Sequence, residues 1–92
     1  MNNGLMKSAA IVCREVALDG APILHAERSE PQDEADSGWQ FLCGGSNEDW
    51  SAAQVWAVDE VLKREPSLSQ FIDLPVGTVL SRESATDEWK IE

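Results

Sequence analysis

The sequence predicts a single small domain of the α+β class, with a mostly antiparallel sheet of about four to five short strands and one or two short helices. The chain has 92 residues, which is close to the usual size of one domain. Its apolar residues gather in short runs separated by Gly- and Pro-containing turns, a pattern typical of strands. One longer stretch before Pro66 can follow the helical period. We expect residues 1–7 to be a flexible N-terminus and residues 8–92 to form the domain.

The first two predicted strands lie on either side of a turn. Residues 8–13 are small or β-branched and are typical of a buried strand. Residues 19–22 form the turn, because their glycine accepts a positive φ and their proline cannot donate to a sheet. Residues 23–28 can alternate between two faces. We expect this second strand to be the antiparallel partner of the first.

An acidic loop and an aromatic strand follow. Residues 29–37 are predicted to form the acidic loop, since they contain several carboxylates and no large apolar side chain. Such a loop is either solvated or matched by a basic partner. Residues 39–43 predict a strand with Trp39, Phe41 and Cys43 on one face.

Residues 50–65 allow two interpretations. Their valines fit one face of a helix that ends before Pro66. Alternatively, residues 55–58 form a strand, and Asp59 caps a shorter helix over residues 60–65.

The C-terminal third predicts two further strands. Residues 67–72 can add one helical turn, and residues 74–77 form a turn. Residues 78–82 are predicted to form a strand. Residues 87–91 are expected to form a last edge strand that buries Trp89.

Charge and targeting signals narrow the function. The chain has 7 basic and 17 acidic residues, a net charge of −10 and a pI near 4.3. This balance argues against binding nucleic acid or an anionic membrane, both of which require Lys and Arg. The first residues lack a signal-peptide pattern, and no apolar run approaches the roughly 20 residues of a membrane span. We therefore expect a cytoplasmic protein whose cysteines stay reduced.

The residues that could carry chemistry show no recognisable arrangement. His25 with Cys13 or Cys43 is the one available Cys/His combination, and neither cysteine has neighbours that would stabilise a thiolate. The spacing of these three residues matches no known metal-ligand pattern. We expect no catalytic residue, no metal site and no cofactor, and hence no enzyme. Each cysteine is expected to act as a small buried hydrophobe.

The chain has four tryptophans and no tyrosine. Trp39 and Trp50 lie directly after acidic segments, where a large aromatic ring can anchor a basic partner while carboxylates speed its approach. Any of the four can instead belong to the core. The candidate partner-binding residues are Asp33, Glu34, Asp36, Trp39, Glu48, Asp49 and Trp50.

The segment Asp-Ser-Gly-Trp-Gln-Phe-Leu-Cys-Gly at residues 36–44 resembles the D-S-G-W-x-F-x-x-G signature of a known family. This family is immunity protein family thirty-three of bacterial toxin-immunity systems, formerly a domain of unknown function. Residues 48–50 resemble its acidic-aromatic segment, and residues 59–66 resemble its short helix before a proline. The chain departs from the family at residues 44–47, where many relatives have an acidic residue directly after the first glycine.

The tail of the chain adds to the resemblance, which spans roughly residues 10–89. Residues 71–77 with Arg82 resemble the family's L-D-x-P-x-G … R tail. The resemblance implies an α+β fold, a strand at residues 55–58, and a role as antidote to a toxin used between competing bacteria. It also implies structural roles, a turn and an Arg–carboxylate tie, for the following tail residues: Asp73, Pro75, Gly77 and Arg82.

Together these observations predict a non-catalytic acidic protein that neutralises a basic bacterial toxin by direct binding. The partner is expected to be a protein, with no nucleic acid or membrane involved. One alternative is a general protein-interaction or regulatory module whose acidic surface serves solubility. Another is a small-ligand-binding domain or hydrolase with a pocket near Trp39 and His25.

Overall fold

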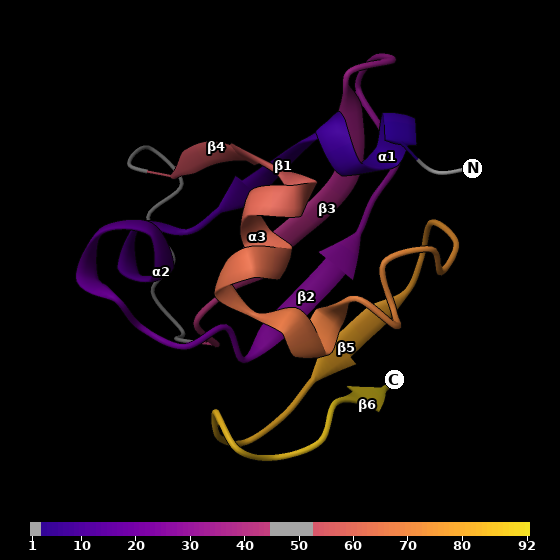
Figure 1. Cartoon of the computed structure of the whole chain (residues 1–92). Helices are drawn as coiled ribbons and strands as arrows, with labels where there is room; N and C mark the ends of the chain where they lie inside the picture. The colour runs from indigo at the N-terminus through magenta and orange to yellow at the C-terminus, as the bar shows by residue number, and fades with distance from the viewer. Residues whose placement is uncertain (1–2, 45–52) are drawn as a thin grey trace.

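The computed structural model describes residues 3–44 and 53–92, which build a six-stranded sheet with three short α-helices and one short 3-10 helix (Figure 1). The elements in chain order are α1 (Asn3–Lys7), β1 (Ala9–Val12), α2 (Arg14–Asp19), β2 (His25–Arg28), β3 (Asp36–Leu42), β4 (Gln54–Ala57), α3 (Val58–Arg64), η2 (Pro66–Leu68), β5 (Val79–Ser81) and β6 (Lys90–Ile91). The predicted α+β class is confirmed, with six strands in the described part rather than four or five.

The strand order is β4-β1-β3-β2-β5-β6, so β1 has β4 and β3 as its neighbours. β1 and β3 are parallel, and all other described pairs are antiparallel. The prediction that residues 23–28 pair with the first strand is therefore wrong. The short helix α2 follows β1 directly and leads the chain away, so no hairpin forms between β1 and β2. The sequence pattern did not indicate α2.

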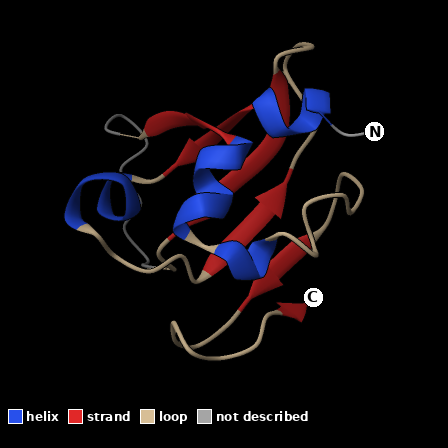
Figure 2. Cartoon of the chain, viewed as in Figure 1, coloured by secondary structure: helices blue, strands red, loops and turns tan. Residues whose placement is uncertain are grey.

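One face of the sheet forms the core together with helix α3. The strand register aligns four residues in a row across four strands, and each of them is fully buried: Val12, Phe41, Ala26 and Leu80. Two valines of α3 belong to the same core, and α3 and η2 lie across this face (Figure 2). Because side chains alternate along a strand, the next row points to the other face, where its residues are half-buried or exposed: Val55, Ile11, Gln40, Glu27 and Val79. That opposite face is the more solvent-accessible one.

Helix α3 begins at Val58, earlier than the helix over residues 60–65 that accompanies the strand interpretation. The strand interpretation of residues 55–58 is confirmed by β4, but Asp59 is not the helix cap. The Ala57 N–H donates to Glu60 Oε1 at 2.8 Å, and this contact satisfies a backbone donor at the start of the helix. At the other end, the Arg64 guanidinium donates to the carbonyl of Val16 within α2 and to that of Ala21 just after it. These bonds fix α3 against the α2 segment.

Buried Arg82, which directly follows β5, connects the C-terminal part of the chain to the rest of the fold. Arg82 Nη2 donates to Glu65 Oε1 at 2.8 Å, and Arg82 Nε donates to the Ile23 carbonyl at 3.0 Å. The guanidinium carbon also lies 4.3 Å from the ring centroid of Trp89. Trp89 Nε1 in turn donates to Ser67 Oγ at 2.9 Å. Arg82 is thus tied to a carboxylate, but that carboxylate is Glu65 and not one of the tail residues for which the resemblance implies the tie. Trp89 is buried as predicted.

The first helix, α1, occupies part of the segment that the sequence pattern left without an element. Lys7 Nζ lies 3.1 Å from Asp59 Oδ2, which links the end of α1 to α3. Across the described residues, no helix has the length and apolar character that crossing a bilayer requires.

Candidate partner-binding surface

The acidic loop (residues 29–37) runs from the end of β2 into the start of β3, and its own carboxylates fold it. Asp33 Oδ1 accepts a hydrogen bond from the Ala35 N–H at 2.8 Å. Asp36 Oδ2 accepts one from the Gln32 N–H, also at 2.8 Å. Aspartate side chains that bond to nearby backbone N–H groups close turns in this way. The loop therefore has a defined shape without help from a partner.

The carboxylates of this loop are not neutralised by the basic residue beside them. Arg28 points inward, where its Nε donates to the Ser37 carbonyl at 3.0 Å and its Nη1 to the Leu74 carbonyl at 2.8 Å. None of the four ion pairs among residues 3–44 and 53–92 includes an acid of the loop. Because Asp33 and Glu34 are exposed, their negative field reaches into solvent.

A shallow groove lies between the acidic loop and the edge of the sheet. Its volume is about 260 Å³, and its lining residues are Ala9, Ala10, Ile11, Gln32, Asp33, Ala35, Asp36 and Val55. Val55 projects from the edge strand β4 and is 72% exposed. Strand residues give the groove an apolar wall, while two carboxylates stand at its loop side. A long basic side chain fits this arrangement, with its methylene stem along apolar atoms and its charged end at carboxylates.

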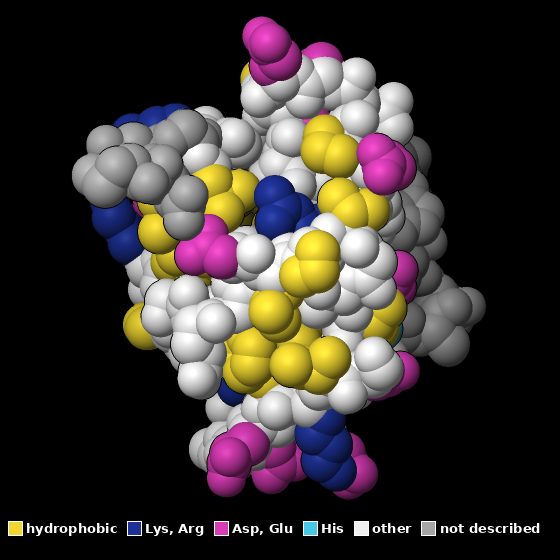
Figure 3. All heavy atoms as spheres, turned by 90° about the vertical axis from the view of Figure 1, so that its right-hand side faces the viewer, with side chains coloured by type: hydrophobic (Ala, Val, Ile, Leu, Met, Phe, Trp, Pro, Cys, Tyr) yellow, Lys and Arg dark blue, Asp and Glu magenta, His cyan; other side chains and the backbone are white. Residues whose placement is uncertain are grey.

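Exposed apolar side chains also occur outside the groove. Apart from Val55, the large hydrophobic residues exposed in the described parts are Leu18, Val76 and Ile91. Figure 3 views the side where α1, the η2–β5 connection and the C-terminus lie, and hydrophobic side chains gather there in the middle of the face. The groove beside the acidic loop differs from this area because it is lined by two carboxylates, Asp33 and Asp36, that make no ion pair with the described residues.

Ser37 and Gly38, at the start of β3, belong to the segment that resembles the family signature. They stabilise the fold rather than form a contact surface. Ser37 Oγ donates to the Ala9 carbonyl at 2.7 Å and so joins β3 to β1. Gly38 has a φ of +84°, and a Cβ there would overlap the Ser29 carbonyl oxygen. Only glycine permits that close approach. These two residues fix the base of the acidic loop.

Trp39 lies in the core and offers no surface to a partner. Its side chain is 1% exposed, and its ring stacks on that of Phe41 with centroids 5.6 Å apart. Its indole N–H donates to the Ile72 carbonyl at 3.0 Å. The interpretation of Trp39 as an exposed anchor is corrected accordingly, because alternation along β3 points this ring toward the face that α3 and η2 cover.

The other predicted contact residues divide into three groups. Asp33 and Glu34 are exposed on the acidic loop. Asp36 is half-buried, and both of its carboxylate oxygens accept backbone hydrogen bonds, so its main role is to shape the loop. Residues 48–50, which comprise Glu48, Asp49 and Trp50, lie outside the described residues.

His25 pairs with a neighbouring acid on the solvent-accessible face of the sheet. Its Nε2 lies 2.7 Å from Glu27 Oε2, and both side chains are partly exposed. Trp39 points to the opposite face. The two residues therefore do not share a pocket, and the hydrolase alternative loses the site it requires.

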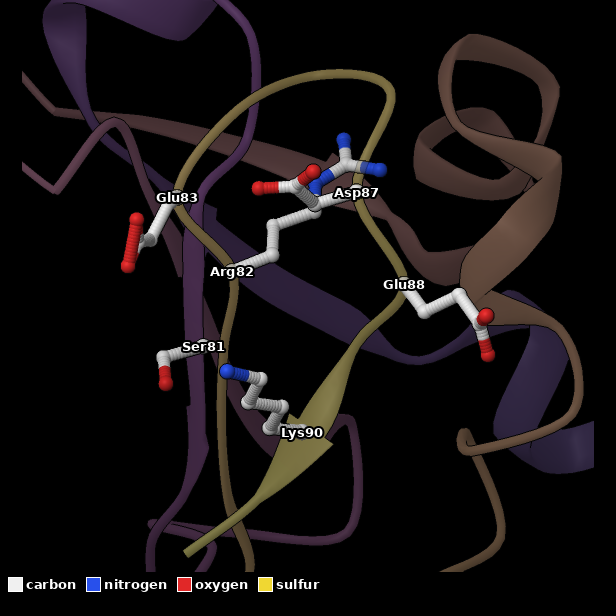
Figure 4. Close-up of a pocket in the computed structure, with 6 residues that line it drawn as sticks. All are labelled: Ser81, Arg82, Glu83, Asp87, Glu88 and Lys90. Carbon is white, nitrogen blue, oxygen red and sulfur yellow. The ribbon is translucent and has the colours of Figure 1, made fainter.

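A second hollow, of about 520 Å³, lies in the connection between β5 and β6 (Figure 4). Its lining residues are Ser81, Arg82, Glu83, Asp87, Glu88 and Lys90. Arg82 is engaged with Glu65 and Trp89. The side chains of Glu83 and Glu88 point to opposite sides (Figure 4). These two carboxylates therefore do not converge on a common ligand position.

The structure also brings three possible metal ligands together, two of them close in sequence and the third about thirty residues further along the chain. Cys13, Glu15 and Cys43 have ligand atoms that all lie within 4.8 Å of one another. Nothing in the sequence pattern around Glu15 indicates a ligand. Spacing along the chain could not reveal this cluster, because the parallel pairing of β1 and β3 creates it.

Comparisons with known proteins identify the chain at the level of a family. A search of curated proteins and a search of solved structures both find no match. The family model of the Immunity protein Imm33 domain matches residues 10–92. This range includes residues 36–44, strand β4 beside the groove, and Arg82. The chain therefore belongs to the Imm33 immunity protein family.

Proposed function

We propose that this protein neutralises a cognate bacterial toxin by binding it directly, and that the acidic loop with its adjoining groove makes the contact. The observation that carries the proposal is the pair of exposed carboxylates on Asp33 and Glu34, which make no ion pair with the described residues, together with the apolar groove that Asp33 lines at the edge of the sheet. Family membership implies a toxin partner. The charge of the chain favours a partner with a basic surface.

Electrostatic attraction provides the first step of binding. A net charge of −10 produces a field that steers a basic protein toward this one. Complementary charges raise association rate constants from about 10⁵–10⁶ M⁻¹s⁻¹ toward about 10⁸–10⁹ M⁻¹s⁻¹ at low salt. Fast capture suits an antidote, because a toxin that is bound early does no damage.

The groove provides the second step, in which the encounter becomes a stable complex. A lysine or arginine of the toxin would place its stem against Val55 and Ile11 and its charged end near Asp33. Because the loop is already folded by its own hydrogen bonds, little conformational entropy is lost when the partner binds.

If this protein neutralises the toxin by covering the toxin's functional surface, no catalysis by this chain is required. The toxin's own basic residues, which a nuclease or similar enzyme uses to hold its substrate, would be covered by the acidic loop. We propose that this happens in the cytoplasm of the producing cell.

Co-expression with the cognate toxin tests the proposal. Asp33→Asn combined with Glu34→Gln removes two loop charges, and Glu83→Gln combined with Asp87→Asn removes two exposed charges from the β5–β6 connection. The loop double variant should lose protection of growth and copurify poorly with the toxin, while the control double variant should protect like the wild type. Equal protection by both double variants, at equal protein levels, would contradict the proposed contact.

A further inference from the structure

The carboxyl ends of two parallel strands place two thiols and one carboxylate together. Cys13 directly follows β1, and its N–H donates to the Phe41 carbonyl of β3 at 3.0 Å, so it extends the pairing of the two strands. Cys43 directly follows β3, and Glu15 lies in the first turn of α2. The sulfur atoms of both cysteines and one carboxylate oxygen of Glu15 lie within 4.8 Å of one another. No disulfide joins the cysteines.

The carboxylate of Glu15 is a second sign of a cation. Its Oε1 is shielded from solvent and has no hydrogen-bond partner among the described residues. A shielded carboxylate oxygen without a hydrogen-bond donor is unfavourable, because its hydrogen bonds to water are lost and no other hydrogen bond replaces them. A bound cation would compensate for that loss.

We propose that Cys13, Cys43 and Glu15 bind a zinc-class divalent ion. In a tetrahedral site with Zn–S distances of about 2.3 Å, two sulfur ligands are about 3.8 Å apart. Since the three ligand atoms lie within 4.8 Å of one another, side-chain movements of about 1 Å bring them to that geometry. Three protein ligands leave the fourth position to water, and Cys43 and Gly44 are not fully buried.

The donor set selects the type of metal. Thiolates are soft ligands that prefer zinc over magnesium or calcium, which take oxygen ligands. Each thiol releases one proton when it coordinates the ion. Two thiolates and one carboxylate then contribute −3 against the +2 of the ion, which leaves a charge of about −1 at the site.

The position of the site gives it a structural role that is independent of the partner-binding surface. The acidic loop enters β3 at Asp36, which aligns with Ala9 at the beginning of β1. The thiols lie at the other end of the same two strands. A bound ion would link β1, α2 and β3 at that end, and the toxin contact does not depend on it.

Titration of the full-length, reduced chain with cobalt(II) and with zinc tests the site. Cobalt(II) bound to thiolates gives a sulfur-to-metal charge-transfer absorption, which a site of oxygen ligands alone does not show. The wild type should bind one equivalent of cobalt with this absorption, and one equivalent of zinc should displace it. Zinc should also raise the Tm of the chain.

Variants make the test specific. Cys43→Ser should abolish the charge-transfer absorption or shift it to that of a single thiolate, and Glu15→Gln should weaken zinc binding at least about tenfold. Asp19→Asn, an exposed acid at the end of the same helix, is the matched control and should bind like the wild type. Circular dichroism verifies that each variant is folded. Absence of the thiolate absorption in the folded, reduced wild type, or unchanged zinc affinity in Cys43→Ser, would overturn the proposal.

Discussion

The Ser29 N–H donates a hydrogen bond to the Gly38 carbonyl at 2.8 Å, and the two backbones approach so closely that a Cβ at Gly38 would overlap the Ser29 carbonyl oxygen. This contact closes the base of the acidic loop, where the chain leaves β2 and enters β3. It explains why glycine stands between Ser37 and Trp39. The base of the loop that we assign to toxin binding is thus held in place by the close backbone approach of Gly38 to Ser29.

Gly38→Ala should destabilise the protein severely. The substitution adds the overlap with Ser29 to the strain of a φ of +84°, and we expect a loss of roughly 3 kcal/mol or more. Gly20→Ala is the control, because Gly20 has a similar φ of +75° but nothing within 4 Å of the added Cβ. It should cost about 1 kcal/mol. Urea unfolding measures both values, and equal losses would show that the overlap is relieved at little cost.

Arg82→Lys should show that the buried guanidinium is not replaceable by another cation. Lysine keeps the charge but cannot bond to Glu65 and Ile23 together or stack on Trp89. We expect a loss of about 2–3 kcal/mol in the free energy of unfolding. Arg14→Lys alters an exposed pair with Asp19 and should change the free energy by less than about 0.5 kcal/mol. A similar small effect at both positions would contradict the structural role of Arg82.

Trp39→Phe should separate stability from binding. Loss of the indole N–H leaves the buried Ile72 carbonyl without its donor, which we expect to cost about 2 kcal/mol. The association rate with toxin, measured on the folded fraction, should not change, because the side chain is 1% exposed. A slower association at unchanged stability would instead make Trp39 a binding residue.

Val55→Thr should weaken the toxin complex without affecting the fold. Threonine keeps the β-branched shape on the edge strand but places a hydroxyl in the apolar groove. Since Val55 is 72% exposed, the free energy of unfolding should change by less than about 0.5 kcal/mol. The dissociation rate of the toxin complex should rise roughly threefold or more. Val76→Thr, at a residue that is 42% exposed outside the groove, should leave the dissociation rate unchanged.

Local patterns were sufficient for much of this fold. The strands near residues 8–13, 23–28, 39–43 and 78–82 follow from short apolar runs between turn residues, and each corresponds to an observed strand. Pro66 lies just beyond the end of α3, as a proline requires of a preceding helix. These features depend on neighbours along the chain, which the sequence displays directly.

Features that depend on distant residues were not predictable in the same way. The parallel pairing of β1 with β3 joins segments separated by a helix, a strand and a loop, and no local pattern encodes it. Helix α2 has six residues and one buried side chain, Val16, which is too short for a helical period to stand out. The approach of Cys13 to Cys43 depends on the same long-range pairing, so it was not predictable from the sequence either.

The candidate site was predicted in part. The acidic loop was evident from composition, and its exposed carboxylates lie where a partner can reach them. The position of Trp39 directly after those acids makes it a candidate anchor, with a place in the core as the alternative. Its place on the helix-covered face of the sheet depends on packing that sequence proximity does not describe.

The salt dependence of toxin association tests the central claim most directly. For the wild type, the association rate measured by stopped flow should fall steeply as salt rises, because salt screens the attraction between the acidic loop and a basic toxin. Asp33→Asn combined with Glu34→Gln should slow association roughly tenfold at low salt and flatten the salt dependence. The control pair Glu83→Gln and Asp87→Asn should stay within about twofold of the wild type. Equal rates and equal salt slopes for the two double variants would contradict the account, because the loop would then contribute no more than any other pair of surface charges.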